Sequence, residues 1–191
     1  MDLSSSGDTV LVVDDEKEIA DVYAEHLEER YTVRTAYSGD GAIESMSPDI
    51  DVVLLDRRMP DKSGGEVIDR IRERGYNCRV VFITAVEPDL DVLSLGFDEY
   101  LTKPVLARDL YDVVDAMLAR NEYVATVREA ISLASRIATL ESKMDVEELE
   151  ESDRYAEVQQ RFHALREEMQ TPPSEGIYSE LTREKLEVLF E

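Results

Sequence analysis

Short apolar runs alternate with segments of helical periodicity from residue 9 to about residue 119. The runs are five or six residues long, and most are rich in β-branched side chains, a pattern typical of strands in a buried sheet. The run DVVLL at 51–55 is the most continuously apolar, as expected for a strand buried on both faces. The pattern predicts strands at 9–13, 32–36, 51–55, 79–84 and 98–102.

Helical patterns follow these strands. The apolar residues of the first predicted helix share one face, namely Ile19, Val22, Tyr23 and Leu27. A second helix is predicted to begin near Gly39 to Gly41 and to stop before Pro48, and Gly64-Gly65 opens a third. A short helix is predicted around 89–95, and another begins at about Ala107.

Five βα units in about 115 residues predict an α/β domain with a doubly wound parallel sheet. The handedness of βαβ crossovers leaves few topologies, and the flavodoxin-like (βα)5 fold with strand order 2-1-3-4-5 is the commonest at this size. In that fold ligands bind at the carboxyl ends of the strands. Chemistry is therefore expected on the residues that directly follow each strand.

The C-terminal part is predicted to be all-α. Residues 107 to 141 contain no Gly or Pro, so the last helix of the sheet domain either runs on or breaks near Asn121. After a polar stretch, apolar residues recur at 3-4-3-4 spacing: Tyr155, Val158, Phe162, Leu165 and Met169. This spacing predicts an antiparallel helical hairpin or one strand of an intermolecular coiled coil. Residues 1–8 are expected to be flexible, and 171–191 to form a linker and a short helix.

Composition narrows the possible partners and surroundings. The formal net charge is -23, with 44 acidic and 21 basic residues of which five are Lys. Such a surface repels nucleic acid and anionic lipid, and it suits a halophilic protein or an ordinary acidic cytosolic one. A lone cysteine, Cys78, excludes an internal disulfide and a Cys-based zinc site. Neither a signal peptide nor an apolar run long enough to span a membrane is found, so we expect a cytoplasmic protein with no membrane partner.

Polar residues end or directly follow four of the predicted strands: Asp14 and Asp15, Asp56, Thr84, and Lys103 before Pro104. In a parallel sheet these points lie side by side, which clusters three carboxylates in one pocket. The carboxylates would repel one another unless a cation lay among them, and oxygen ligands favour Mg²⁺. A carboxylate beside Mg²⁺ can attack a phosphoryl group, while an ammonium and a hydroxyl bind the phosphoryl oxygens.

These residues stand in the motifs VVDDE, VVLLDRRMPDKSGGE, VVFITA and GFDEYLTKP, which together resemble the receiver domain of two-component response regulators over 9–119. The resemblance implies that Asp56 accepts a phosphoryl group from a histidine kinase and that Mg²⁺ is the cofactor. It implies metal binding by Asp15 directly, by Asp14 through water, and by Asp56 and the backbone carbonyl of Arg58. It further implies that Thr84 and Tyr100 form a switch and that Lys103 binds the phosphoryl group after a cis bond to Pro104. A receiver catalyses its own phosphorylation and dephosphorylation and is not a conventional turnover enzyme.

Each of these residues also has a plainer interpretation. Asp14 could cap the following helix, Thr84 could be an ordinary strand residue, Tyr100 could be core, and Lys103 could be solvated. Arg58 departs from commoner receiver patterns, which place a smaller or polar side chain there. Its guanidinium either lies solvated along the rim or contacts the phosphoryl group and tunes dephosphorylation. Arg57 is expected to face solvent.

The stretch LASRIATLESKMDVEELEESDRYAEVQQRFHALREEM resembles the HalX family of haloarchaeal receiver-linked helical domains, and the predicted hairpin spans 120–170. Three interpretations of function follow. The first is a phosphorylation-switched protein whose helices bind a protein or form a homodimer. The second is a DNA-binding regulator, against which stand the 17 acidic and 9 basic residues of 119–191 and the lack of a basic recognition helix. The third, a haloacid-dehalogenase-type phosphatase, fits poorly because that family places two aspartates two residues apart after its first strand.

Overall fold

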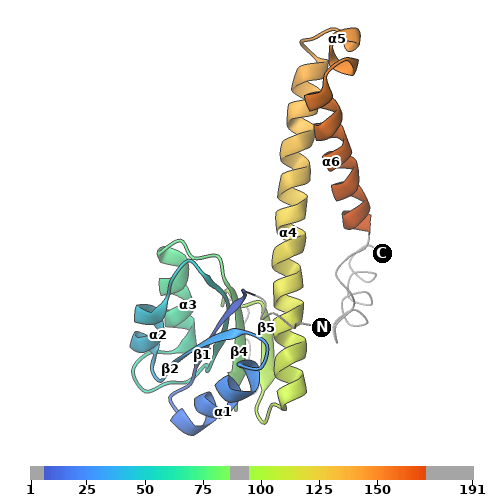
Figure 1. The fold of residues 1–191 in the computed structure, drawn as a ribbon. Helices are drawn as coiled ribbons and strands as arrows, with labels where there is room; N and C mark the ends of the chain where they lie inside the picture. Colours follow the sequence, from blue (N-terminus) through green and yellow to red (C-terminus); the bar gives the residue numbers. More distant parts are fainter. Residues whose placement is uncertain (1–6, 87–94, 171–191) are drawn as a thin grey trace, which may run out of the picture. The chain divides into compact units, whose positions relative to one another are not determined.

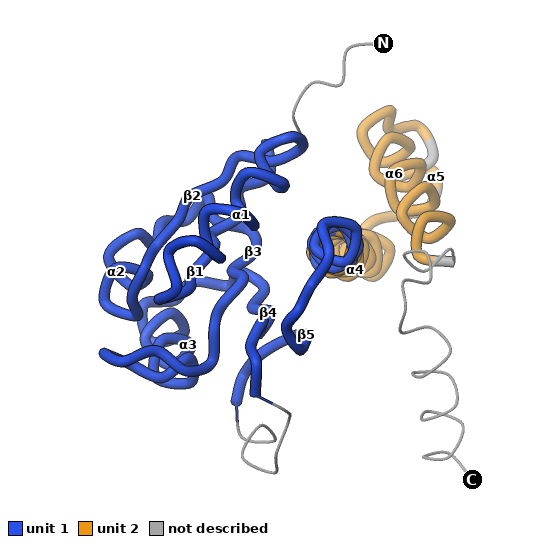
Figure 2. The backbone as a smooth tube through the Cα atoms, turned by 90° about the horizontal axis from the view of Figure 1, so that it is seen from below, with its two compact units in different colours: residues 1–118 blue, residues 119–191 orange. Residues whose placement is uncertain are grey.

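The structure is a computed structural model that describes residues 7–86 and 95–170. The chain divides into two compact units, residues 1–118 and 119–191 (Figure 2). Unit 1 holds a parallel sheet of order β2-β1-β3-β4-β5, so the predicted topology is confirmed (Figure 1). Its strands are β1 (Thr9–Val13), β2 (Thr32–Ala36), β3 (Ile50–Leu55), β4 (Arg79–Thr84) and β5 (Glu99–Thr102). Its helices are α1 (Lys17–Leu27), α2 (Gly39–Ser45), α3 (Gly64–Glu73) and the beginning of α4 (Ala107–Glu141).

Both faces of the sheet are covered, because successive strand residues point to opposite sides. On one face, strand residues such as Val53 and Phe82 pack with α2 and α3. On the other, residues such as Leu54 and Ile83 pack with α1 and the first turns of α4. The apolar runs of the central strands therefore serve two cores at once, which explains why they do not alternate with polar residues.

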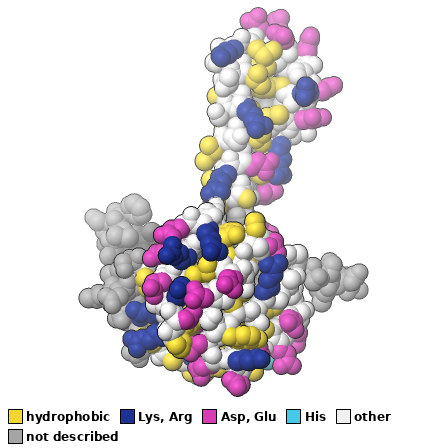
Figure 3. All heavy atoms as spheres, turned by 90° about the vertical axis from the view of Figure 1, so that its left-hand side faces the viewer, with side chains coloured by type: hydrophobic (Ala, Val, Ile, Leu, Met, Phe, Trp, Pro, Cys, Tyr) yellow, Lys and Arg dark blue, Asp and Glu magenta, His cyan; other side chains and the backbone are white. Residues whose placement is uncertain are grey.

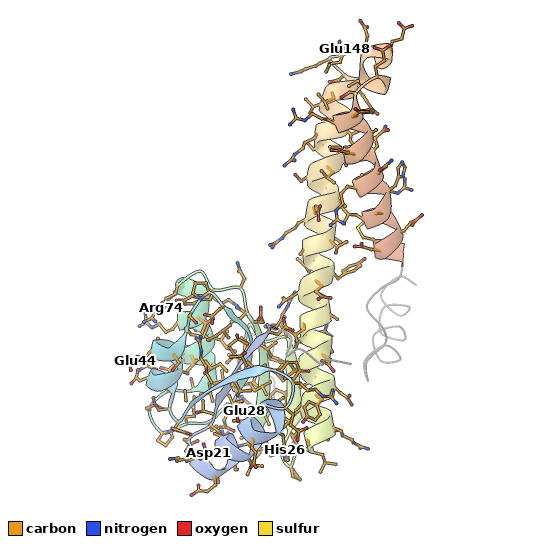
Figure 4. The ribbon with its side chains drawn as sticks, viewed as in Figure 1. Asp21, His26, Glu28, Glu44, Arg74 and Glu148 are labelled. Carbon is orange, nitrogen blue, oxygen red and sulfur yellow. The ribbon has the colours of Figure 1, made fainter. Side chains whose placement is uncertain are left out.

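Side-chain hydrogen bonds attach the covering helices to one another. The Arg74 guanidinium at the end of α3 donates to the carbonyl of Ile43 on α2 at 2.7 Å (Figure 4). The Tyr111 hydroxyl on α4 donates to the carbonyl of His26 on α1 at 2.6 Å. These bonds join pairs of helices on the same face of the sheet, and so they stiffen the frame that carries the strand ends.

One expectation about the helices of unit 1 needs correction, and another falls on residues outside the described ranges. Val22 was expected on the inward face of α1, but it is 48% exposed. The buried residues of α1 are Ala20, Tyr23, Ala24 and Leu27, so the face that meets the sheet excludes Val22. The helix predicted around 89–95 falls almost wholly on residues 87–94, which lie outside the described residues.

Unit 2 contains a helical hairpin. Helix α4 continues through Asn121 without a break to Glu141, and α5 (Val146–Glu150) and α6 (Asp153–Gln170) follow. The Tyr155 hydroxyl bonds to Glu141 at 2.8 Å, whereas Arg161, further along α6, bonds to Glu129, further back on α4. As residue numbers increase along α6, those of the bonded partners on α4 decrease, so the two helices form an antiparallel hairpin.

The predicted apolar spacing of α6 marks the face that packs on α4. Leu165 is fully buried with Ala130 and Leu133 of α4, and Val158, Phe162 and Met169 pack against this cluster. Helix α5 was not predicted, because its five-residue sequence VEELE is short and mostly acidic; its Leu149 is nevertheless buried. Among the described residues, no helix combines the length and the apolar content that crossing a membrane requires.

Candidate functional site

The candidate site lies where β1, β3, β4 and β5 end, at the carboxyl edge of the sheet. The residues just beyond the strands extend the backbone ladder by one hydrogen bond. The Asp56 N–H donates to the Val13 carbonyl at 2.8 Å, and the Lys103 N–H donates to the Thr84 carbonyl at 2.9 Å. These bonds fix the directions of the Asp56 and Lys103 side chains, so the strands themselves position the chemistry.

Lys103 joins the two buried carboxylates of the site. Its ammonium nitrogen lies 2.6 Å from Asp14 Oδ2 and 3.2 Å from Asp56 Oδ1. The side chains of Lys103, Asp14 and Asp56 are only 11%, 4% and 7% exposed. The prediction that these residues come together is confirmed, and a solvated Lys103 is excluded.

The second oxygen of each carboxylate also accepts a hydrogen bond. The Arg58 N–H donates to Asp56 Oδ2 at 2.7 Å, and the Glu16 N–H donates to Asp14 Oδ1 at 3.0 Å. The N-cap residue of α1 is Glu16, so Asp14 binds the backbone just before this helix but is not its cap residue, contrary to its plainer interpretation. Charge-assisted bonds of this kind hold both carboxylates in place.

Burial and charge oppose each other in the pKa values of the pair. Burial raises the pKa of Asp14 above its usual value, although its bond to Lys103 acts in the opposite direction. Burial lowers the pKa of Lys103, but the hydrogen bond to Asp14 and the charge of Asp56 outweigh it, so the pKa is raised overall. Lys103 is therefore a firmly charged ammonium between two carboxylates at neutral pH.

The donor set is chemically suited to a hard divalent cation. Asp14, Asp15 and Asp56 supply only carboxylate oxygens, and three carboxylates outweigh the single ammonium of Lys103. Asp15 is exposed beside the buried Asp14. Within the described ranges, however, no three His, Cys, Asp or Glu residues are arranged as a ready ligand group. Mg²⁺ thus fits the site by the chemistry of its oxygen donors, and the ammonium occupies the gap between two of them.

Thr84 and Tyr100 both bond to the backbone of Val86. The Val86 N–H donates to Thr84 Oγ1 at 3.4 Å, and the Tyr100 hydroxyl donates to the Val86 carbonyl at 2.6 Å. Thr84 is buried at the end of β4, and the half-buried Tyr100 ring packs edge-on against Phe82 and Phe97 at 5.9 Å each. Tyr100 is thus attached to the core, and the segment after Thr84 links it to the site.

The two arginines after Asp56 differ from each other. Arg58 has an exposed side chain, while its N–H binds the Asp56 carboxylate. Arg57 was expected to face solvent, but it is half-buried and its carbonyl accepts the Gly64 N–H at 2.8 Å. The expectation for Arg57 was wrong because the loop turns back toward α3 and encloses that residue. The Lys103–Pro104 bond is cis, as the resemblance implied.

The loop after Asp56 is held at both ends by residues that the sequence analysis did not single out. Asp61 accepts the N–H groups of Gly39 and Asp40, at 3.1 and 2.8 Å, and so caps the start of α2. Ser63 and Glu66 form a reciprocal capping box at the start of α3. The Ser-x-x-Glu pattern could have revealed the capping box. Asp61 carries no such local signal, because its partners lie 21 and 22 residues away.

Gly64 sets how closely the loop approaches the sheet. A Cβ at this position would lie 2.5 Å from the Phe82 ring and 2.8 Å from the Asp56 carbonyl. No side chain fits there without moving the backbone of Asp56. Glycine at this position therefore helps to position Asp56.

Family comparisons agree with this geometry. The model of the response regulator receiver domain matches residues 10–115, and that of the HalX domain matches residues 119–190. A protein of Haloferax volcanii, provisionally described as a transcriptional regulator, is 45% identical over 160 residues, which are 83% of this chain and 27% of that protein. The response regulator SaeR of Staphylococcus epidermidis is 35% identical over 115 residues, 58% of this chain and 50% of SaeR. The chain matches half the length or less of these two curated relatives.

A solved structure shows the same fold in the first unit. The BeF3-activated receiver domain of DrrB, a response regulator of Thermotoga maritima, is 32% identical with a TM-score of 0.54. The likeness covers 59% of this chain and 98% of that domain. The family match over more than half of the chain and this structural likeness point to the same family. This chain belongs to the response regulator receiver family of two-component systems, and its receiver domain is followed by a HalX domain.

Proposed function

We propose that the protein is the response regulator of a phosphorelay and that Asp56 accepts a phosphoryl group from a histidine kinase in the presence of Mg²⁺. The observation that carries the proposal is the environment of Asp56. This buried carboxylate contacts the Lys103 ammonium through one oxygen and the Arg58 N–H through the other. A carboxylate held in this way is oriented for attack on phosphorus. The neighbouring ammonium can stabilise the negative charge on the oxygens of the transferred phosphoryl group.

The reaction can be written with these residues. An Asp56 oxygen attacks the phosphorus of a phosphohistidine, the P–N bond breaks, and the imidazole leaves with its electron pair. Lys103 already contacts the Asp56 carboxylate, so its ammonium is near enough to pair with a phosphoryl oxygen. Asp14, Asp15, Asp56 and the Arg58 carbonyl would hold Mg²⁺, which neutralises charge on the transferring oxygens when bound.

Thr84 and Tyr100 would transmit the change. If Thr84 Oγ1 turns to a phosphoryl oxygen, it gives up the N–H of Val86, whose carbonyl holds the Tyr100 hydroxyl. The segment after β4 can then rearrange, and the Tyr100 ring can move against Phe82 and Phe97. Tyr100 can therefore pack in the aromatic cluster and still act in the switch, because its ring makes the aromatic contacts and its hydroxyl bonds to Val86.

Phosphorylation with a small-molecule phosphodonor tests the proposal. Acetyl phosphate with Mg²⁺ is expected to add one phosphoryl group to the full chain, detected by intact-mass spectrometry. The Asp56→Asn variant should gain none, whereas Asp69→Asn, which removes an exposed carboxylate of α3, should react as the parent does. Phosphoryl addition to the Asp56→Asn chain at the parent's rate would refute the assignment.

A role for the exposed Arg58 side chain is proposed separately. Its N–H already binds Asp56, so its guanidinium is attached close to the acceptor and can shield or contact the phosphoryl group. Arg58→Asn is expected to change the phosphoryl half-life at Asp56 while leaving the site of phosphorylation the same. Equal half-lives for the two proteins would remove this role.

The output is proposed to act through the hairpin, by binding a protein or a second copy of the chain in the cytoplasm of a halophile. The acid-rich, Lys-poor sequence and the Haloferax volcanii relative support this setting. DNA binding is the second candidate, favoured by the description of that relative as a transcriptional regulator. A DNA mobility-shift assay with phosphorylated parent and Asp56→Asn chains separates the two, since a shift that requires Asp56 would favour the DNA-binding candidate.

A further inference from the structure

Helix α4 carries an apolar stripe apart from the face that packs on α6. The outer stripe consists of residues spaced 3-4-3-4 along α4, namely Val124, Val127, Ile131, Ala134 and Ala138. Ile131 is 65% exposed, more than any other large hydrophobic residue among those described, and Val124 is 37% exposed. Figure 3 shows apolar side chains at the surface of the hairpin, among charged ones.

The outer stripe does not belong to the hairpin core. At about 100° per residue, it is centred about 120° around the helix from the face that holds Ala130 and Leu133. Those two residues are buried against Leu165 of α6, whereas Ile131, the next residue after Ala130, is exposed. A helix that needed only one apolar face for α6 would be expected to place polar residues at these positions.

Charge distinguishes this part of α4 from the rest of the chain. Acidic residues make up 44 of 191 overall, but residues 123–140 contain a single one, Glu129. Glu129 is bonded to Arg161 of α6 at 2.8 and 2.9 Å and lies on the opposite side of α4 from the outer stripe. The positions that flank the stripe are Tyr123, Arg128, Ala130, Ser135 and Ile137, none of which is acidic.

The lack of carboxylates around the outer stripe indicates which kind of partner binds there. Two chains of net charge -23 repel each other over most of their surfaces, so association is most favourable where carboxylates are missing. A basic partner would be matched by carboxylates on the stripe, and a nucleic acid by basic residues on it, but the stripe itself is apolar. Depletion of charge around an apolar centre is typical of the core of a protein–protein interface.

We propose that the outer stripe is a homodimer interface, in which α4 helices of two copies pair in parallel. Val124 and Ile131 would take one core position of the heptad and Val127 and Ala134 the other; β-branched residues at the first position favour two parallel strands. Because the stripe spans only about two heptads, the dimer is expected to be weak and to strengthen in concentrated salt, where self-repulsion is screened. The proposal is independent of the chemistry at Asp56.

Disulfide trapping of the full chain tests contact and orientation. In a Cys78→Ala background, Ile131→Cys and Val124→Cys are each expected to give a covalent dimer on mild oxidation. Arg136→Cys, exposed on the far side of α4, should remain monomeric. Cross-linking of the Ile131→Cys chain alone would contradict the parallel arrangement, and equal cross-linking of all three would contradict the interface.

Mass measurement without cross-links gives an independent readout. Light scattering with size exclusion in multimolar salt should show a concentration-dependent dimer for the parent and at least a tenfold weaker one for Ile131→Ser. Circular dichroism should show equal helix content, because the side chain is exposed in the hairpin. A parent that stays monomeric at every concentration and salt overturns the proposal, as does a dimer of Ile131→Ser as strong as that of the parent.

Discussion

The receiver and the hairpin use apolar residues in different ways. In the receiver, buried side chains cover both faces of the sheet, and the same unit buries Asp14, Asp56 and Thr84 at one edge. The hairpin buries only a narrow seam around Leu165, and its ion pair between Glu129 and Arg161 is exposed. A large core can offset the cost of a buried charged pocket, whereas a two-helix seam cannot. The buried polar residues accordingly lie in the receiver, whereas the hairpin leaves apolar residues such as Ile131 exposed.

The largest expected effect comes from the receiver core. Phe82 is fully buried and packs with Phe97 at 5.2 Å, so Phe82→Ala is expected to lower the free energy of unfolding by about 3–5 kcal/mol. Leu165→Ala is the matched change in the hairpin, where it should lower helix content. Urea unfolding followed by circular dichroism, with phosphorylation of Asp56 assayed in parallel, measures both. If Leu165→Ala abolished phosphorylation, the two units could not be treated as independent.

The charged pocket is expected to give the next largest effect. Lys103→Met leaves the buried carboxylates of Asp14 and Asp56 without their shared ammonium. Stability without divalent cations should fall by about 2–3 kcal/mol, somewhat less than the loss of a fully buried partner costs, because the Lys103 side chain is still 11% exposed. Added Mg²⁺ should restore part of the loss, as measured by the urea midpoint. Lys62→Met, which removes a lysine outside the pocket, should show neither effect.

The site was largely predictable because it follows from the topology. Parallel strands end at one edge, so the residues after four apolar runs had to meet, and Asp14, Asp56, Thr84 and Lys103 do lie at those ends. What could not be predicted was that the Lys103 ammonium lies between two carboxylates. That arrangement depends on side-chain distances over sequence separations of 89 and 47 residues.

Other features escaped prediction for physical reasons that can be named. The helical period alone placed Val22 inward, but the sheet meets a face of α1 that excludes it. Helix α5 was missed since five residues are too few to show a helical period, although Leu149 is buried. Arg57 was expected in solvent because a loop arginine usually is; its half-burial depends on the return of the loop toward Gly64.

A smaller effect is expected where the loop after Asp56 meets α2. Asp61 accepts two N–H groups at the start of that helix, so Asp61→Ala should lower stability by about 1 kcal/mol, as loss of a cap does. Burial raises the pKa of Asp61, but the bonds from the Asp40 and Gly39 N–H groups outweigh it and lower the pKa overall. The stabilisation is therefore present above the pKa of an unfolded aspartate, about 3.9, and is lost as the pH falls through the lowered value.

Urea midpoints of the parent and Asp61→Ala chains at neutral and acidic pH measure this effect. Lys62→Ala breaks only the partly exposed ion pair with Asp40 at 3.0 Å and should cost less than the loss of the Asp61 cap. A gap between the parent and Asp61→Ala that grew on acidification would be the wrong sign for a carboxylate with a lowered pKa. In that event Asp61 would not act as a charged cap.

The smallest effect is expected in the hairpin, at the exposed pair of Glu129 and Arg161. The hydrogen bond from Arg161 lowers the pKa of Glu129, so the pair stabilises the hairpin above the pKa of an unfolded glutamate, about 4.3. That contribution disappears as the pH falls through the lowered pKa. Glu129→Gln should therefore melt slightly below the parent at pH 7 and together with it in strong acid, when helix loss is followed by circular dichroism. Glu157→Gln, an exposed change on α6, serves as the control, and an equal shift for both variants at pH 7 would show that total charge rather than this pair sets the difference.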